Sequence, residues 1–178
     1  MRADLVLISH DHFDHNCYNA VKGADSSLIS KPVLTVEKGV RVEGIPADHD
    51  TDGGRRRGKI TVFRFELDGV SFCHMGDIGH TVDEAMADKI GPVDVLFVPV
   101  GDTFTIGPQG ARDVIDTIEP RIAIPMHYRT SGLSISIQPV QRFLDAVKGR
   151  KVIQVGNEVD FSREDLPDSH AEIWVFSL

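Results

Sequence analysis

The chain has 178 residues, of which 41% are hydrophobic, and a formal net charge of −8 at pH 7. This length and apolar content can supply the core of one domain, so we expect a single domain over residues 1–178. The acidic charge argues against a general nucleic-acid-binding protein, because a surface that follows phosphates needs an excess of Lys and Arg. The sequence has no apolar run of about twenty residues to span a membrane and no basic-then-apolar leader. With only two cysteines, it is typical of a reducing, cytoplasmic compartment.

The first predicted element is a buried strand over residues 3–8, a short and partly β-branched apolar run bounded by polar residues. It leads directly into the sequence SHDHFDH. Side chains alternate in an extended segment, so His10 and His12 project to one side and can bind one metal ion, while Asp14 and His15 can face a second. Imidazoles with a carboxylate suit zinc, with iron or manganese as alternatives. The competing interpretation is a histidine-rich surface loop.

Strands dominate the segment that follows. A short helix over residues 16–21 is expected to end at Lys22-Gly23. A polar segment with three consecutive arginines, residues 48–58, has the composition of a loop. Asp68-Gly69 is a strong hairpin signal between two apolar runs, the second of which leads to Met75-Gly76-Asp77. The strands of this part are predicted at residues 27–35, 40–47, 60–67 and 70–74.

From residue 80 onward, strands alternate with helices. Thr81 can cap a helix over residues 82–90, which has acidic residues in its first turn. Pro108 suits the first turn of a helix that reaches residue 118, and Pro139 opens a last helix that reaches residue 147. The strands are predicted at residues 93–100, 121–125, 151–155 and 173–177. The pattern predicts a layered α/β sandwich with ligand-type residues at strand ends.

Three further candidate ligands, His49, Asp77 and His127, fall where predicted strands end. A lone histidine at such a place is more often structural or solvated than a ligand. The joint appearance of these residues behind a His-x-His-x-Asp-His cluster favours a metal site.

The whole pattern resembles the metallo-β-lactamase superfamily of binuclear metallohydrolases, whose fold is an αββα sandwich. The segments at residues 3–16, 74–80, 99–101 and 125–128 are similar to a small prokaryotic branch of predicted metal-dependent hydrolases, which is related to the ascorbate-phosphate lactonases. The similarity runs from residue 3 to about residue 130, and the histidine cluster is its most specific part.

The resemblance implies a centre with two divalent metal ions, most often Zn²⁺, with Mn²⁺ or Fe²⁺ as alternatives. By position, the ligands would be His10, His12 and His49 for the first ion, Asp14, His15 and His127 for the second, and Asp77 as the bridge between them. The implied reaction uses a metal-bridging hydroxide to hydrolyse an ester, lactone or phosphodiester bond of a small-molecule substrate. Asp14 or Asp77 would orient that hydroxide as the catalytic carboxylate. Histidine rather than glutamate at position 12 resembles the hydrolytic members and not the di-iron oxygen-reducing flavoproteins.

Other residues near the predicted ligands have two interpretations each. His80 either contacts a ligand or the substrate, or is simply solvent-exposed. Tyr128 either donates to an oxyanion or packs beside its strand. The arginine run that ends at Arg57 either binds a phosphate or carboxylate of an anionic substrate or pairs with acidic residues of a solvated loop. His74 is expected to be structural.

Members of this family begin with several more strands, on the order of forty residues, before the segment that corresponds to residues 3–8. We therefore expect one sheet to lack its opening strands. An open sheet edge favours pairing with a second chain, so a homo-oligomer is expected, and no membrane or nucleic-acid partner is expected. The alternative function is that of a non-catalytic, metal-stabilised interaction protein.

Overall fold

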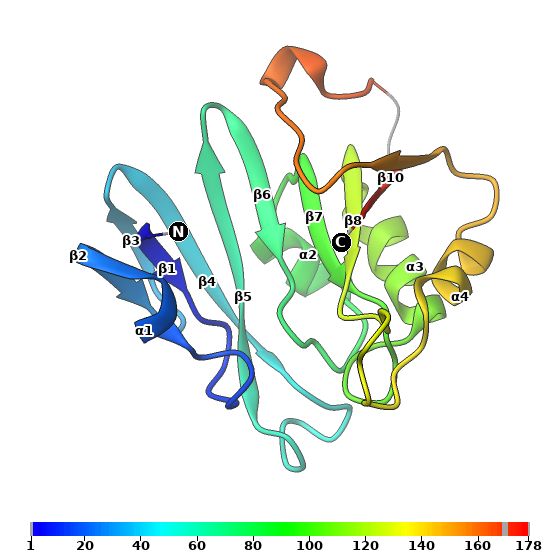
Figure 1. Ribbon diagram of the computed structural model, residues 1–178, viewed down its shortest axis with the longest axis horizontal. Helices are drawn as coiled ribbons and strands as arrows, with labels where there is room; N and C mark the ends of the chain where they lie inside the picture. The colour runs from blue at the N-terminus through cyan, green and yellow to red at the C-terminus, as the bar shows by residue number, and fades with distance from the viewer. Residues whose placement is uncertain (1, 169–170, 178) are drawn as a thin grey trace.

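The computed structural model describes residues 2–168 and 171–177. His170, to which the sequence assigns no role, lies outside the described residues. One large sheet forms the centre, with helices against one face and a small two-stranded sheet against the other (Figure 1). The layered α/β fold expected from the sequence is confirmed.

The large sheet has eight strands in the order β3-β4-β5-β6-β7-β8-β10-β9. Strands β3 to β6 pair antiparallel, and β6, β7, β8, β10 and β9 pair parallel. Because β4 and β6 are both antiparallel to β5, the carboxyl ends of strands β4, β6, β7 and β8 all lie at the same edge of the sheet, the one toward which these strands run. The bounds are β3 (Leu34–Glu37), β4 (Val40–Asp48), β5 (Lys59–Leu67), β6 (Val70–His74), β7 (Val95–Pro99), β8 (Ile122–Met126), β9 (Val152–Val155) and β10 (Glu172–Phe176).

The small sheet pairs β1 (Ala3–Leu7) in parallel with β2 (Lys22–Ile29), and the one-turn helix α1 (Tyr18–Val21) connects them. It packs on the large sheet through a buried cluster of Ile29, Val42 and Phe63. Beyond the end of β1, the Thr61 amide of β5 donates a 2.8 Å hydrogen bond to the Ser9 carbonyl. This bond fixes the segment after β1, which carries the histidine cluster, beside the same edge of the large sheet (Figure 1).

Three helices, α2 (Glu84–Ile90), α3 (Pro108–Ile118) and α4 (Val140–Ala146), cover one face of the large sheet. The main apolar core lies there and includes Leu96, Ile115 and Phe143, each fully buried. A second cluster on the opposite face contains Trp174 and is covered by the segment around the short helix η1 (Arg163–Asp165). Within the described part of the chain, no helix has the length and apolar character needed to cross a membrane.

Most predicted elements are present, and the differences have local causes. The strand predicted at residues 27–35 is wrong: β2 ends at Ile29 and β3 begins at Leu34, with Pro32 in the interruption, because proline cannot donate to a sheet. Thr81 is not the cap of α2. The Asp83 carboxylate accepts a 2.8 Å hydrogen bond from the Met86 amide and starts the helix at Glu84.

Candidate metal centre

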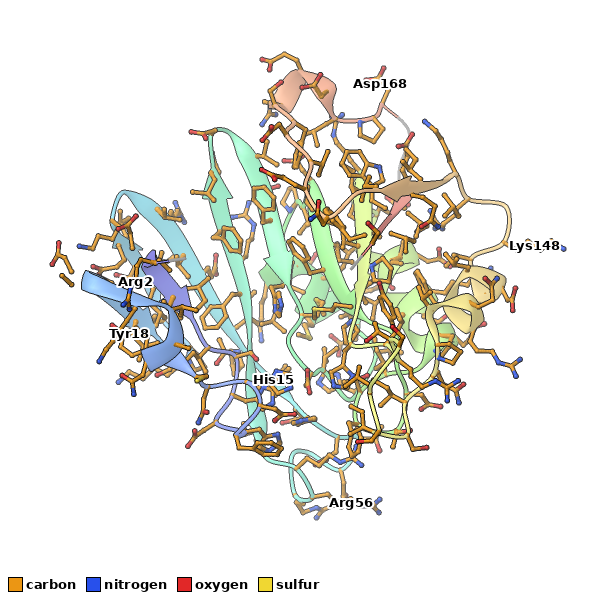
Figure 2. The ribbon with its side chains drawn as sticks, viewed as in Figure 1. Arg2, His15, Tyr18, Arg56, Lys148 and Asp168 are labelled. Atoms are coloured by element: carbon orange, nitrogen blue, oxygen red, sulfur yellow. The ribbon has the colours of Figure 1, made fainter. Side chains whose placement is uncertain are left out.

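The structure brings all seven predicted ligands together at the common edge of the strands. Four of them follow β1, and the others follow β4, β6 and β8: His10, His12, Asp14, His15, His49, Asp77 and His127. The His10 ring lies 4.6 Å from the His12 ring, 4.7 Å from the His15 ring and 4.9 Å from the His49 ring, measured between centroids. Figure 2 shows His15 between the two sheets, just above the loop that carries Arg56.

The buried carboxylate of Asp77 lies at the centre of this cluster. Its Oδ2 atom is within 4 Å of four imidazole Nε2 atoms, at 3.8 Å for His10, 3.6 Å for His15, 3.6 Å for His49 and 3.5 Å for His127. Only 5% of Asp77 is exposed. One carboxylate oxygen shared by so many imidazoles is an arrangement that metal ions between them would stabilise.

Two groups of ligand atoms are close enough to share an ion. The ligand atoms of His10, His12 and His49 lie within 4.8 Å of one another, and so do those of His10, His15 and Asp77. The other two predicted ligands each approach a member of the second group. Asp14 Oδ2 is 3.6 Å from His15 Nε2, and His127 Nε2 is 3.5 Å from Asp77 Oδ2.

Several imidazole nitrogens in the cluster are buried without a hydrogen-bond partner. Among the side chains that the structure describes, these atoms are His10 Nε2, His49 Nδ1 and His127 Nδ1. A buried polar atom without a partner destabilises a fold, and imidazole nitrogens are common metal ligands. Of these atoms, His10 Nε2 also lies 3.8 Å from Asp77 Oδ2 at the centre of the cluster, so this nitrogen and the ligand atoms around it fit a bound metal ion.

Burial sets the protonation state of His10 and His49. It lowers the pKa of His10 from 6.5 to about 4, although the neighbouring Asp77 carboxylate opposes the shift. Burial also lowers the pKa of His49, again against the effect of Asp77. Both rings are therefore neutral at pH 7, which is the form that binds a metal ion.

Ser9 controls the orientation of the His10 ring. Its Oγ atom lies 2.9 Å from His10 Nδ1. This hydrogen bond occupies one ring nitrogen and leaves Nε2, on the side of Asp77, for a metal ion.

Tight backbone packing supports the segments that carry Asp77 and His49. The Gly76 amide donates a 3.1 Å hydrogen bond to His74 Nδ1, so His74 stabilises the turn before Asp77. A β-carbon on Gly79 would lie 2.4 to 2.5 Å from backbone atoms of His49 and Asp50. Only glycine allows these two segments to approach so closely.

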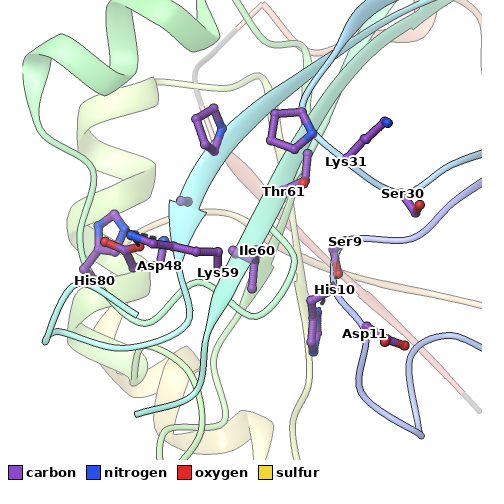
Figure 3. Close-up of a pocket in the computed structure, with 13 residues that line it drawn as sticks. Ser9, His10, Asp11, Ser30, Lys31, Asp48, Lys59, Ile60, Thr61 and His80 are labelled. Atoms are coloured by element: carbon purple, nitrogen blue, oxygen red, sulfur yellow. Dashed lines mark hydrogen bonds and ion pairs between the residues drawn. The ribbon is translucent and has the colours of Figure 1, made fainter. Parts of the chain in front are cut away.

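The candidate ligands border a pocket of about 450 Å³. Six of the seven line it, together with an apolar and cationic wall formed by Phe13, Arg56, Arg57, Phe104 and Ile135. The seventh, His10, lines a neighbouring pocket of about 670 Å³ with Ser9, Lys59 and His80 (Figure 3). The first pocket is therefore where a small molecule can reach the metal centre.

Two of the predicted substrate contacts lie away from that pocket. His80 Nε2 accepts a 3.3 Å hydrogen bond from the Asp48 amide, and its Nδ1 lies 2.9 Å from the Thr81 carbonyl. His80 thus holds the end of β4, one residue before His49, and borders the larger pocket (Figure 3). Tyr128 packs against the main core, and its hydroxyl donates a 3.5 Å hydrogen bond to the Phe176 carbonyl. Of the two interpretations, Tyr128 therefore has the packing role.

The three consecutive arginines have different surroundings. Arg55 and Arg56 both form ion pairs with Asp52, and both side chains are 78% exposed. Arg57 instead lies over the Phe104 ring, with its guanidinium carbon 5.0 Å from the ring centroid. Arg55 and Arg56 are thus solvated and paired with Asp52, although Arg56 also reaches the pocket rim, whereas Arg57 borders the pocket beside Phe104.

Asp50 is the functional candidate that the sequence pattern did not reveal. Burial by itself would raise the pKa of this carboxyl, but backbone hydrogen bonds from Arg57, Asp52, Arg56 and Gly54 outweigh it and lower the pKa to about 2. The only sequence signal is an acidic residue just before a glycine-containing turn, where aspartate often binds backbone amides.

The comparisons with known proteins agree with this geometry. Residues 1–127 match the β-lactamase superfamily domain. The chain belongs to the metallo-β-lactamase superfamily. A crystal structure from Thermotoga maritima, assigned as a Zn-dependent hydrolase of this superfamily, superposes with a TM-score of 0.81 at 36% identity and covers 98% of this chain and 82% of that one.

Other metallo-β-lactamase relatives are similar over most of their length. A UPF0173 metal-dependent hydrolase from Thermococcus kodakarensis is 32% identical over 155 residues, which cover 73% of this chain and 69% of that protein. A Staphylococcus aureus protein with the same description is 30% identical over 194 aligned residues, covering 90% of this chain and 83% of that protein. A Bacillus subtilis metallo-β-lactamase fold protein, at 10% identity and a TM-score of 0.59 over 97% of this chain and 74% of that one, shares the fold alone.

Proposed function

We propose that this protein is a binuclear metallohydrolase that cleaves an ester, lactone or phosphodiester bond in a small anionic substrate. The observation that carries the proposal is the position of Asp77 Oδ2, 3.5 to 3.8 Å from four imidazole Nε2 atoms. His10, His12 and His49 would hold one ion, Asp14, His15 and His127 would hold the other, and Asp77 would contact both. The histidine-rich ligand set favours zinc over Mn²⁺ or Fe²⁺.

Divalent ions at such a centre lower the pKa of a bound water and polarise the carbonyl or phosphoryl oxygen of a substrate. The two candidate catalytic carboxylates, Asp14 and Asp77, have different surroundings and therefore different tasks. Asp77 is buried and orients the imidazoles around it. The Asp14 side chain is 52% exposed and lines the pocket, so we assign its carboxylate to accept a proton from the attacking water.

The pocket wall indicates the kind of substrate. Arg57 supplies positive charge, and Phe13, Phe104 and Ile135 supply apolar surface beside the candidate ligands. The volume of the pocket, about 450 Å³, suits a small molecule rather than a polymer segment. We therefore expect a substrate that joins an anionic group to an apolar group.

Metal analysis combined with turnover tests this proposal. The protein is reconstituted with zinc, its metal content is measured, and hydrolysis is assayed on aryl esters, lactones and bis-aryl phosphodiesters. Two ions per chain and turnover on one substrate class would support it. Two bound ions with a raised Tm but no turnover on any class would favour the alternative, a non-catalytic, metal-stabilised interaction protein.

A further inference from the structure

We infer that Arg57 is the binding residue for an anionic group of the substrate, and that Asp50 positions it by organising the loop between β4 and β5. The inference rests on the proposed function, since it names how that substrate is recognised. We call residues 50–58 the arginine loop. It joins the candidate ligand His49 to the pocket wall.

A single carboxylate organises the arginine loop. Asp50 Oδ1 accepts hydrogen bonds from the amides of Asp52 at 2.8 Å and Gly54 at 2.9 Å. Its Oδ2 accepts from the amides of Arg56 at 2.9 Å and Arg57 at 2.8 Å. Only 8% of Asp50 is exposed, so these four bonds replace the water that the carboxylate has lost.

These bonds determine where the Arg57 backbone lies, because the loop has little other support. Two backbone hydrogen bonds close its base, from the Gly58 amide to the Gly54 carbonyl and from the His49 amide to the Gly58 carbonyl, and a longer one, 3.4 Å, joins the Arg55 amide to the Asp52 carbonyl. The rest of the loop is exposed to solvent apart from Asp50 and two intermediate positions. Removing the charge of Asp50 would therefore release the segment that carries Arg57.

Arg57 has the surroundings of a binding residue rather than of a paired surface charge. Its guanidinium stacks on Phe104, and among the described residues it forms no ion pair, whereas Arg55 and Arg56 share Asp52. An arginine held against an aromatic ring keeps its N–H groups free to bind a phosphate or carboxylate in a bidentate manner.

The nearby metal centre requires an experiment that separates two effects. Asp50 directly follows His49, so a substitution could act through the metal instead of through Arg57. We therefore measure three quantities: the affinity of the zinc-loaded protein for inorganic phosphate, its affinity for zinc, and hydrogen exchange of the loop amides in the metal-free protein. None of the three requires turnover.

The test variants are Asp50→Asn and Arg57→Gln, and the matched controls are Asp52→Asn and Arg55→Gln in the same loop, because Arg55 does not line the pocket. We expect each test variant to weaken phosphate binding by about tenfold or more, as for loss of hydrogen bonds to a charged group. Asp50→Asn should also speed exchange of the four amides bound by Asp50, and Arg57→Gln should not. Zinc affinity should be unchanged in all four variants, and Arg57→Lys should restore phosphate binding in part.

Three results would overturn the inference. Wild-type protein that does not bind phosphate, or Arg57→Gln that binds it normally, would place the anion site elsewhere. Asp50→Asn with weakened zinc binding and normal phosphate binding would show that Asp50 serves the metal ligand. Because Arg57 is near the surface of the loop, its variant remains informative even if Asp50→Asn does not fold. Arg57-dependent phosphate binding without turnover on any substrate would instead contradict the proposed function and leave this inference standing.

Discussion

A β-carbon placed on Gly101 would lie 2.0 Å from the carbonyl oxygen of His127. The two residues follow the neighbouring strands β7 and β8, which are joined there by a hydrogen bond from the Val100 amide to the Met126 carbonyl. The Gly101 carbonyl accepts a hydrogen bond from the Gln138 amide. His127 itself has a φ of +54°, a left-handed conformation that L-residues seldom adopt. The position of this candidate ligand therefore depends on the absence of a side chain from the adjacent segment.

Gly101→Ala should displace His127 and weaken the second metal site. We expect the variant to bind one zinc ion per chain with near-normal affinity and to lose the second. Elemental analysis measures the number of zinc ions bound per chain, and a competition titration with a zinc chelator measures the affinity of each site. Gly156→Ala is the matched control, because its β-carbon would meet no atom closer than 3.7 Å. Two tightly bound ions in the Gly101→Ala protein would show that His127 is not a ligand.

Asp77→Asn should reduce both metal binding and turnover. The substitution removes the negative charge that lies 3.5 to 3.8 Å from four imidazoles, so two cations would repel each other with less compensation. We expect occupancy of the second site to fall and activity to fall by about a hundredfold or more. Asp88→Asn, on the exposed side of α2, serves as the control. Turnover near the wild-type value would place the bridging ligand elsewhere.

The sequence pattern predicted that His49, Asp77 and His127 each follow a strand. It did not give the directions of those strands, so their meeting was implied by the resemblance to the superfamily. In the structure, those strands end at one edge of one sheet. The His-x-His spacing also predicted that His10 and His12 project to the same side, because side chains alternate along an extended segment.

The remaining features depend on partners that are distant in the sequence or that have no side-chain signature. Asp50 binds backbone amides, which nearly every residue carries, so the sequence signals its role only through the glycine-containing turn that follows it. The environment of Arg57 differs from that of Arg55 and Arg56 because Phe104, on a separate loop, contacts its guanidinium group. Tyr128 follows a candidate ligand directly, yet its hydroxyl bonds to Phe176 at the far end of the chain.

Acid should destabilise the metal-free protein between about pH 6.5 and pH 4. Burial lowers the pKa of His10 to about 4, so the unfolded chain binds the proton more readily than the folded chain. The stability contributed by neutral His10 is fully present above pH 6.5 and decreases as the pH falls toward 4. His49 shifts in the same direction.

Thermal unfolding in the presence of a chelator measures this effect. The Tm should fall as the pH is lowered from about 6.5 to 4. In the His10→Asn variant the Tm should fall less over this range, because asparagine does not titrate. A Tm that stays constant from pH 6.5 to pH 4 would mean that the histidine rings are hydrated in the metal-free protein.

The two cysteines should react at very different rates. Cys17 is exposed, whereas Cys73 is fully buried, and burial raises the pKa of its thiol to about 12. A thiol reagent reacts with the thiolate, so at pH 8 we expect one thiol per native chain to react quickly and the second only after unfolding. Cys17→Ser should abolish the fast reaction. A fast reaction of both thiols would indicate that the core around Cys73 opens readily.

Finally, we propose that the chain forms a homo-oligomer through exposed strand edges. In the described part of the chain, the small sheet has only β1 and β2, and β3 is an edge strand of the large sheet. Leu34 and Val36 on β3 are 62% and 66% exposed, so this edge combines unpaired backbone groups with apolar side chains. The C-terminal strand β10 does not cover such an open edge, because it is paired on both sides within the large sheet.

We expect sedimentation at micromolar concentration to show a dimer, the simplest closed assembly for such an edge. Val36→Lys should shift the protein toward the monomer, since a lysine on an edge strand opposes pairing. Val152→Lys, on the edge strand β9 at the other end of the same sheet, is the control and should leave the assembly unchanged. A wild-type protein that sediments as a monomer, or a Val36→Lys protein that remains a dimer, would rule out pairing through β3.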